Sequence, residues 1–118
     1  KRSPLRDVAG MLRSFHYASH AALMEHGEDS ISHLLDPSSL APWARFWYRW
    51  VSSAFLGGYM AAAVRAPFLP EGQQELEMLL NAFLLEKAVY ELGYELNNRP
   101  GWVTIPIQGV LQLLDSAD

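Results

Sequence analysis

Proline and glycine divide this chain into a few long segments, and these breaks limit the folds that it can adopt. The clearest breaks are RAPFLPEG at 65–72 and NNRPG at 97–101, and each interrupts a segment of helical periodicity. The residue before a proline avoids the helical region, so a helix that reaches Arg99 should end there. We therefore expect a small number of helices joined by short breaks.

The first helix is predicted over residues 4–26, where apolar side chains recur every three or four positions. Ser3 is the expected N-cap, and Pro4 suits the first helical position. Residues 27–39 carry turn chemistry, with a short helical turn expected at 31–35.

Three further helices follow from the same periodicity. They are predicted at 42–64, 71–97 and 106–114, and Thr104 or Ile105 should cap the last one. WVTIPI alternates weakly, but it is short and proline interrupts it, so it does not predict a strand. The predicted fold class is all-α with four main helices, the second of them strongly hydrophobic.

Composition narrows the class of protein. A chain of 118 residues, half of them apolar, is long enough for a single domain spanning 1–118. A net charge of −4 with no basic run argues against nucleic-acid binding, and the lack of cysteine excludes disulfides. The longest uncharged apolar stretch, Trp50–Val64, is shorter than the ~20 residues of a membrane span. The lack of cysteine permits a reducing compartment, and we expect a cytoplasmic protein.

His16 and His20 lie one helical turn apart, as metal ligands can. No third ligand is evident, and zinc usually takes three or four protein ligands, so we expect two ordinary helix histidines and no metal site. Together with Arg6 and Arg13 they form a polar stripe. Such a stripe lines a cleft in some proteins, but it is more often a solvated helix face.

The most informative stretch is EKAVYELGYELNNRPGW at 86–102. At helical spacing, Lys87, Glu91, Tyr94 and Asn98 share one stripe, and Tyr90 runs beside it. The apolar side chains of this helix should then supply its core contact, namely Leu85, Val89, Leu92 and Leu96.

Arg99 and Trp102 follow this helix directly, on the segment where the chain turns back. Sugar hydroxyls need charged or amide hydrogen-bond partners, and the C–H faces of a sugar ring pack well on an aromatic ring. Residues 86–102 therefore present the groups that a carbohydrate site requires. The alternative is an ordinary solvated helix end, since Lys87 and Glu91 form a common surface pair and tyrosine is often half-buried.

No catalytic motif accompanies this candidate site. The chain contains no nucleophile–base pattern, no glycine-rich phosphate loop and no metal-binding motif. We therefore assign no catalytic residue in this chain.

Two segments of the chain carry a resemblance to a known family. SPLRDVAGMLRSFHYA at 3–18 and FLLEKAVYELGYELNNRPGWVTIPIQGVLQLL at 83–114 resemble the C-terminal part of bacterial maltokinases, including the kinase modules fused to trehalose synthase. The resemblance implies the helical C-terminal lobe of a protein-kinase-like, aminoglycoside phosphotransferase-like fold. It also implies that the catalytic and metal-binding aspartates and the nucleotide-binding lobe lie upstream of this chain.

The same resemblance implies a function. Maltokinases use ATP and Mg²⁺ to phosphorylate the anomeric hydroxyl of maltose, and the product feeds α-glucan synthesis from trehalose. We expect this chain to supply part of the maltose site, to bind no cofactor itself and to have no kinase activity alone. Glu91, Arg99 and Trp102 are the first expected maltose contacts, followed by Lys87, Tyr90, Tyr94 and Asn98. Members of the family usually carry Asp where this chain has Gly101.

Two other interpretations remain open. In the first, the chain is a non-catalytic helical interaction domain, and its Trp-rich second helix contacts a partner protein. In the second, it is part of a phosphotransferase that acts on another acceptor. As a piece of a longer protein it would expose apolar surface, so we expect self-association. The sequence leaves open whether a trehalose synthase domain is fused upstream.

Overall fold

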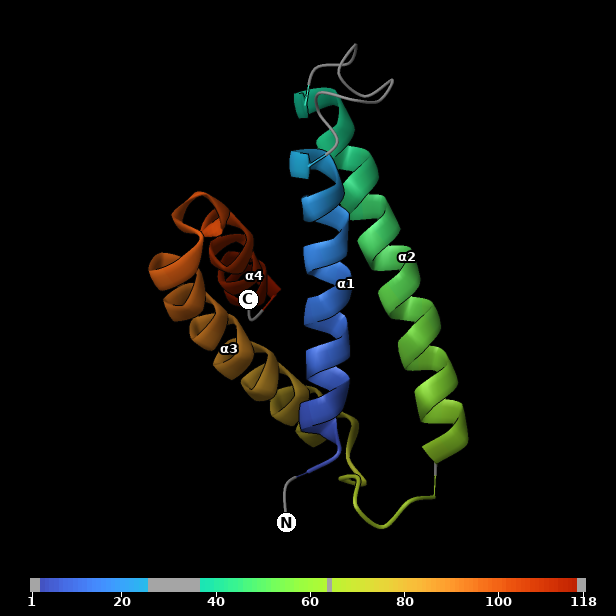
Figure 1. Ribbon diagram of the computed structural model, residues 1–118. Coiled ribbons are helices and arrows are strands. Elements are labelled where there is room, and N and C mark those ends of the chain that lie inside the picture. Colours follow the sequence, from blue (N-terminus) through green and yellow to red (C-terminus); the bar gives the residue numbers. More distant parts are fainter. Residues whose placement is uncertain (1–2, 26–36, 64, 117–118) are drawn as a thin grey trace. The chain divides into compact units, whose positions relative to one another are not determined.

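The computed structural model describes residues 3–25, 37–63 and 65–116 (Figure 1). Four α-helices and one short 3₁₀ helix account for nearly all of them, and these three segments contain no strand. The elements are α1 (Leu5–Glu25), α2 (Pro37–Ala63), α3 (Gln73–Asn98), η2 (Pro100–Trp102) and α4 (Thr104–Ser116). The prediction of an all-α fold with four main helices is confirmed.

The signal that starts α1 and the signal that stops α3 act as predicted, whereas α3 begins at Gln73, two residues later than expected. The Ser3 hydroxyl oxygen accepts a hydrogen bond from the Leu5 backbone N–H at 3.2 Å, which makes Ser3 the N-cap of α1. α3 ends at Asn98, and the Arg99 backbone N–H still donates a hydrogen bond to the Glu95 carbonyl at 2.7 Å. Pro100 then opens η2.

Two helices begin earlier than the sequence indicated. α2 begins at Pro37, so residues 37–39 are helical rather than part of a turn, and it continues through Pro42. Proline suits the first position of a helix, and a second one five residues later removes a single backbone hydrogen bond. α4 begins at Thr104 for a similar reason, because Pro106 falls within its first turn. The short turn expected at 31–35 lies outside the described residues.

The chain divides into two units. Residues up to Arg13, together with those from Arg65 onward, form the first unit, and the stretch between them forms the second. The amino-terminal part of α1 thus belongs to the first unit and its carboxyl-terminal part to the second.

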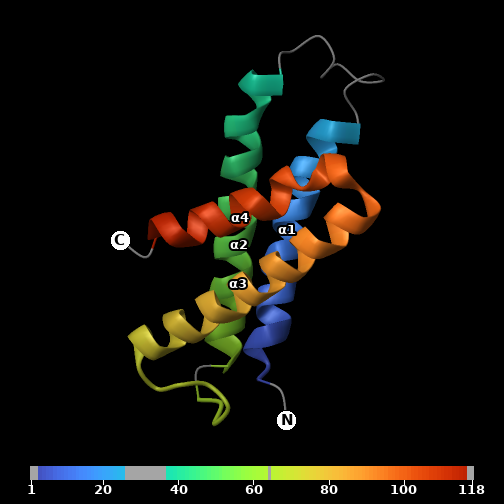
Figure 2. The ribbon, with the colours of Figure 1, turned by 90° about the vertical axis from the view of Figure 1, so that its left-hand side faces the viewer.

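In the first unit, α3, η2 and α4 form a helical hairpin with η2 at its apex (Figure 2). α4 packs against α3, and the 3₁₀ turn contacts both helices. The buried apolar side chains described in this unit come from three helices, and they are Leu5, Val8, Ala9, Leu12, Leu84, Ala88, Ile105 and Pro106. Burying such side chains is the main favourable term for folding, so this cluster fixes the position of α3.

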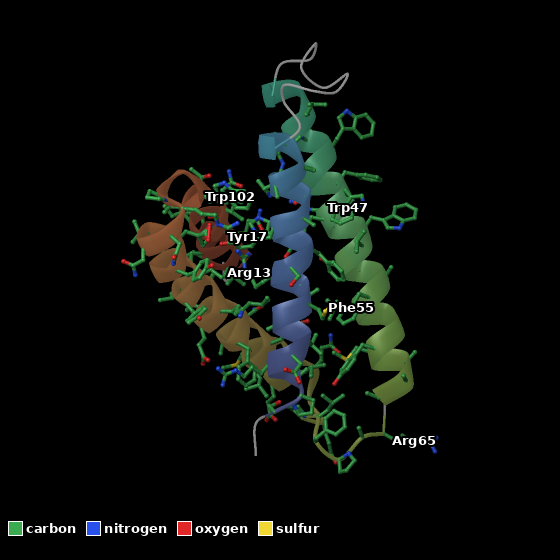
Figure 3. The ribbon with its side chains drawn as sticks, viewed as in Figure 1. Arg13, Tyr17, Trp47, Phe55, Arg65 and Trp102 are labelled. Carbon is green, nitrogen blue, oxygen red and sulfur yellow. The ribbon has the colours of Figure 1, made fainter. Side chains whose placement is uncertain are left out.

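In the second unit, residues 14–25 of α1 pair with α2 through aromatic contacts. The Phe15 and Phe55 rings lie edge to face with centroids 5.5 Å apart, and Figure 3 shows Phe55 between the two helices. The His16 and Tyr48 rings are 5.1 Å apart. No helix in the described segments is both long enough and apolar enough to span a membrane.

Candidate functional site

The candidate site is built where α3 ends and η2 begins. Pro100 stops the helix, and the Trp102 N–H donates to the Arg99 carbonyl at 2.8 Å, which closes a tight turn. This turn places the Arg99 guanidinium over the Trp102 ring, with the guanidinium carbon 3.9 Å from the ring centroid. Such a cation–π contact joins a hydrogen-bond donor to an aromatic surface.

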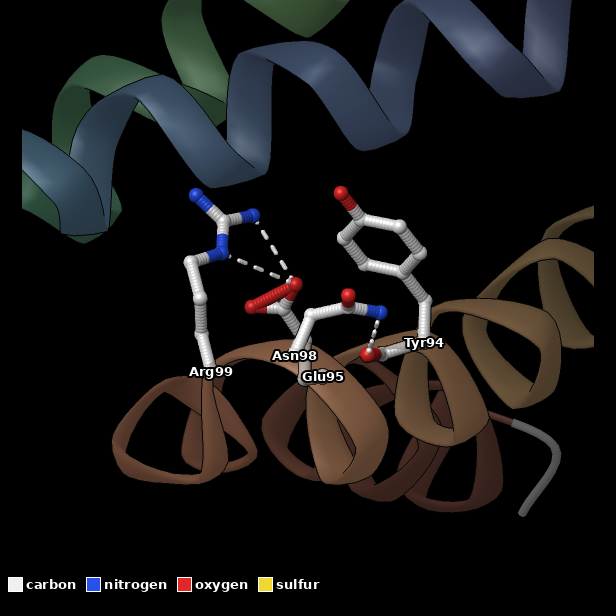
Figure 4. A network of polar contacts seen from close by, with 4 residues as sticks. All are labelled: Tyr94, Glu95, Asn98 and Arg99. Atoms are coloured by element: carbon white, nitrogen blue, oxygen red, sulfur yellow. Dashed lines mark hydrogen bonds and ion pairs between the residues drawn. The ribbon is translucent and has the colours of Figure 1, made fainter.

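Arg99 also pairs with a buried carboxylate. Arg99 donates from Nε and Nη2 to the Glu95 Oε1 atom, at 3.2 and 2.8 Å (Figure 4). The Glu95 side chain is fully buried, whereas that of Arg99 is 45% exposed. The guanidinium is therefore anchored on one side and open to solvent on the other.

The second carboxylate oxygen of Glu95 is buried and has no hydrogen-bond partner among the described residues. A buried acceptor without a hydrogen bond lowers the stability of the folded state, so a glutamate at position 95 is unfavourable for stability. Glu95 was not among the residues predicted for the site. Its position, seven residues after Ala88 on one helix face, was the signal that could have identified it as buried.

Glu91 lies deeper than the sequence analysis placed it. Arg13 donates from Nε to the Glu91 Oε1 atom at 2.7 Å, and the two side chains are only 4% and 12% exposed. Arg13 points from α1 toward α3 in Figure 3. Burial raises the pKa of the Glu91 carboxyl above its ordinary value, although the Arg13 charge and hydrogen bond oppose this shift.

The remaining predicted contacts lie on the open surface of α3. Lys87, Tyr90, Tyr94 and Asn98 are all exposed. The Lys87 amino group is 5.2 Å from the Tyr90 ring centroid, and the Arg99 guanidinium is 5.9 Å from that of Tyr94. Asn98 donates from its side chain to the Tyr94 carbonyl at 2.9 Å.

The structure brings six of the seven predicted residues together in two groups on the surface, with Asn98 bonded to the Tyr94 carbonyl in the first of them. Tyr94, Arg99 and Trp102 are neighbours at the end of α3, and Lys87 with Tyr90 lies about one turn earlier along it. Glu91 belongs to the buried side, where Arg13 binds it. These groups offer guanidinium, ammonium, amide and phenol donors beside aromatic rings, which suits a polyhydroxylated ligand.

The core face of α3 differs from the one expected. Leu85, Val89 and Leu96 are 41%, 56% and 58% exposed, whereas Leu84, Ala88 and Glu95 are buried. Positions 84, 88, 91 and 95 follow one another at helical spacing and share a face. That face carries two carboxylates, so a prediction based on hydrophobicity alone selected the wrong side of the helix.

The polar stripe on α1 is solvated only in part, since the Arg6 side chain is 44% exposed and those of Arg13 and His16 are buried. Arg13 is 3% exposed and His16 is fully buried, because both side chains take part in packing within the protein. The His16 and His20 ring centroids are 4.5 Å apart. His20 Nδ1 lies 3.1 Å from the His16 carbonyl, as in an ordinary helix histidine. No group of three potential metal ligands occurs in residues 3–25, 37–63 and 65–116.

Comparison with protein-family models returned no match for this chain.

Proposed function

We propose that this chain is the acceptor-sugar-binding part of an ATP-dependent maltokinase, in the helical C-terminal lobe of a protein-kinase-like fold. The observation that carries the proposal is the pairing of Arg99 with Trp102 at 3.9 Å, beside the exposed Tyr94 ring. A guanidinium next to aromatic rings supplies both donors for hydroxyl groups and surfaces for C–H faces. The resemblance of residues 3–18 and 83–114 to maltokinases supports maltose as the sugar.

Each side chain has a distinct role in this proposal. Arg99 donates hydrogen bonds to sugar hydroxyls, and the rings of Trp102 and Tyr94 pack against glucose units. Lys87, Tyr90 and Asn98 extend the donor surface along α3, where all three are exposed. Glu91 is the innermost contact, and its bond to Arg13 fixes its orientation.

The phosphoryl-transfer chemistry would belong to other parts of the parent enzyme. Phosphoryl transfer requires ATP, a metal ion and the acceptor to be positioned together. We propose that the nucleotide-binding lobe and the aspartates that bind Mg²⁺ precede this chain in the parent. In this account the parent acts in the cytoplasm, in trehalose and α-glucan metabolism, and this chain binds maltose without phosphorylating it.

A titration of the isotope-labelled chain with maltose tests the proposal. We expect the Trp102 indole and Arg99 Nε–H signals to shift saturably with maltose. Cellobiose, whose two glucose units are joined by a β linkage, serves as the matched control and should have a weaker effect. Unchanged signals at millimolar maltose would contradict the proposal, and so would formation of maltose 1-phosphate by this chain with ATP and Mg²⁺.

One observation favours a second candidate, a helical interaction domain. Trp43, Phe46 and Trp50 of α2 are 70%, 56% and 66% exposed, and they lie at helical spacing on one face. A phosphotransferase with another acceptor shares the same fold and is a third candidate. A panel of sugars and aminoglycosides in the same titration separates it from the maltose proposal.

A further inference from the structure

The strongest feature that the proposed function leaves unexplained is Glu95. It is the fully buried carboxylate on α3, and it lies on the face that also buries Leu84 and Ala88. An apolar side chain at position 95 would continue that face. The presence of a carboxylate there needs a reason other than packing.

A contribution to the stability of the fold does not explain why a carboxylate is buried at position 95. Only one of the two Glu95 oxygens has a partner among the described residues, and the partner, Arg99, is nearly half exposed. Taking a carboxylate out of water is expensive, and an ion pair with one half-exposed partner offsets little of that expense. Replacing such a buried ion with an apolar group of similar volume is often neutral or stabilising.

The geometry of its single pairing supplies a different reason. Both Arg99 hydrogen bonds end on the same Glu95 oxygen, one from Nε and one from Nη2, so the guanidinium has a fixed position on this atom. The same guanidinium lies 3.9 Å from the Trp102 ring centroid. Glu95, Arg99 and Trp102 therefore form a linear series of contacts from the buried face of α3 to the open surface.

We infer that Glu95 is a positioning residue, which holds Arg99 over Trp102 and so prearranges the ligand-binding surface. Glu95 itself does not touch the ligand, because its carboxylate is buried. An arginine that is already held in place loses less conformational freedom on binding, and such prearrangement improves affinity. Only the affinity part of this inference rests on the proposed sugar site, since the contacts of Arg99 and Trp102 exist without a ligand.

Two substitutions at Glu95 and one control test the inference. Glu95→Met keeps the volume roughly constant and removes the acceptor, whereas Glu95→Gln keeps one oxygen and removes the charge. Glu86→Met is the control, because Glu86 is an exposed glutamate on the same helix and pairs with Arg6 at 3.4 Å on the surface. The readouts are the Arg99 Nε–H and Trp102 indole NMR signals, the maltose affinity and the melting temperature.

In Glu95→Met we expect the Arg99 Nε–H signal to move toward that of a free arginine and the Trp102 indole signal to shift. Maltose affinity should fall at least tenfold, while the melting temperature stays the same or rises. Glu95→Gln should show smaller changes in the same direction, and Glu86→Met should show none. A purely structural role predicts the opposite, namely a lower melting temperature with no change of the Arg99 and Trp102 signals.

Arg99 and Trp102 signals that stay unchanged in Glu95→Met overturn the inference. If Glu95→Met does not fold, Glu95→Gln decides in the same way, because its shape is nearly that of the native residue. If the unsubstituted chain binds no maltose, the proposed function fails, but the two NMR signals still show whether Glu95 positions Arg99.

Discussion

The guanidinium of Arg13 lies directly on the backbone of Gly109, at the point where α1 meets α4 in the first unit. A Cβ atom built on Gly109 would come within 2.9 Å of the Arg13 guanidinium carbon, closer than real Cβ atoms approach other heavy atoms. Because Gly109 has no side chain, the Arg13 guanidinium fits against its backbone and donates from Nε to the Glu91 Oε1 atom at 2.7 Å. These three residues connect three helices of the unit.

Gly109→Ala should therefore destabilise the protein. The added methyl group displaces a buried guanidinium and strains its bond to Glu91, so we expect a loss of about 1–3 kcal/mol in the free energy of unfolding. Gly93→Ala is the matched control, because a Cβ at Gly93 of α3 meets nothing within 4 Å. It should stabilise the helix by about 0.5–1 kcal/mol. Urea unfolding of both variants measures the difference, and equal effects would contradict the account.

The raised pKa of Glu91 predicts a pH dependence. In the unfolded chain the pKa of the Glu91 carboxyl is near its ordinary value of 4.5. In the folded protein this carboxyl keeps its proton up to a higher pH. The folded state then binds more protons in this window, so the Glu91 contribution to stability falls as the pH rises from about 4.5 through the folded pKa.

Glu91→Gln removes this contribution. We expect the unfolding free energy of the variant to decrease less steeply with pH above 4.5 than that of the unsubstituted chain, as measured by urea unfolding at a series of pH values. Parallel curves for the two proteins would show that Glu91 does not titrate as described. Glu86→Gln, at an exposed position on the same helix, is the control.

The exposed aromatic face of α2 predicts self-association. Trp43, Phe46 and Trp50 are each more than half exposed. Phe46 and Trp50 also border an open depression that Arg49, Ser53 and Ala54 line with them. We expect Trp50→Ser to lower the average mass measured by sedimentation at high protein concentration. The exposed Tyr90→Ser on α3 should have a smaller effect. A monomer at all concentrations would rule this prediction out.

The backbone of this protein was largely predictable because local signals determine it. Ser3 caps α1 and Pro100 ends α3, as their side-chain chemistry indicates. The start of α2 was predicted five residues too late, since Pro42 can begin a helix as well as lie within one.

The side-chain arrangement of the site was less predictable. Glu91 and Glu95 lie on the buried side of α3, whereas hydrophobicity assigned that side to Leu85, Val89 and Leu96. Burying a charged carboxylate is unfavourable without a partner, and the partner of Glu91 is Arg13, 78 positions away in the chain. A single sequence carries no signal for such a pair. The proximity of Arg99 and Trp102 was easier to predict, since only two residues separate them.

The most direct test of the central claim is the effect of Trp102→Ala on maltose affinity, measured by NMR titration against Trp43→Ala. Trp102 is in contact with Arg99 at the proposed sugar site, whereas Trp43 is 70% exposed on α2. Stacking on an aromatic ring is worth about 1 kcal/mol or more, so losing it should weaken binding at least fivefold. We predict this loss for Trp102→Ala and an unchanged affinity for Trp43→Ala. Equal affinities in the two variants would contradict the assignment of the maltose site to α3 and η2.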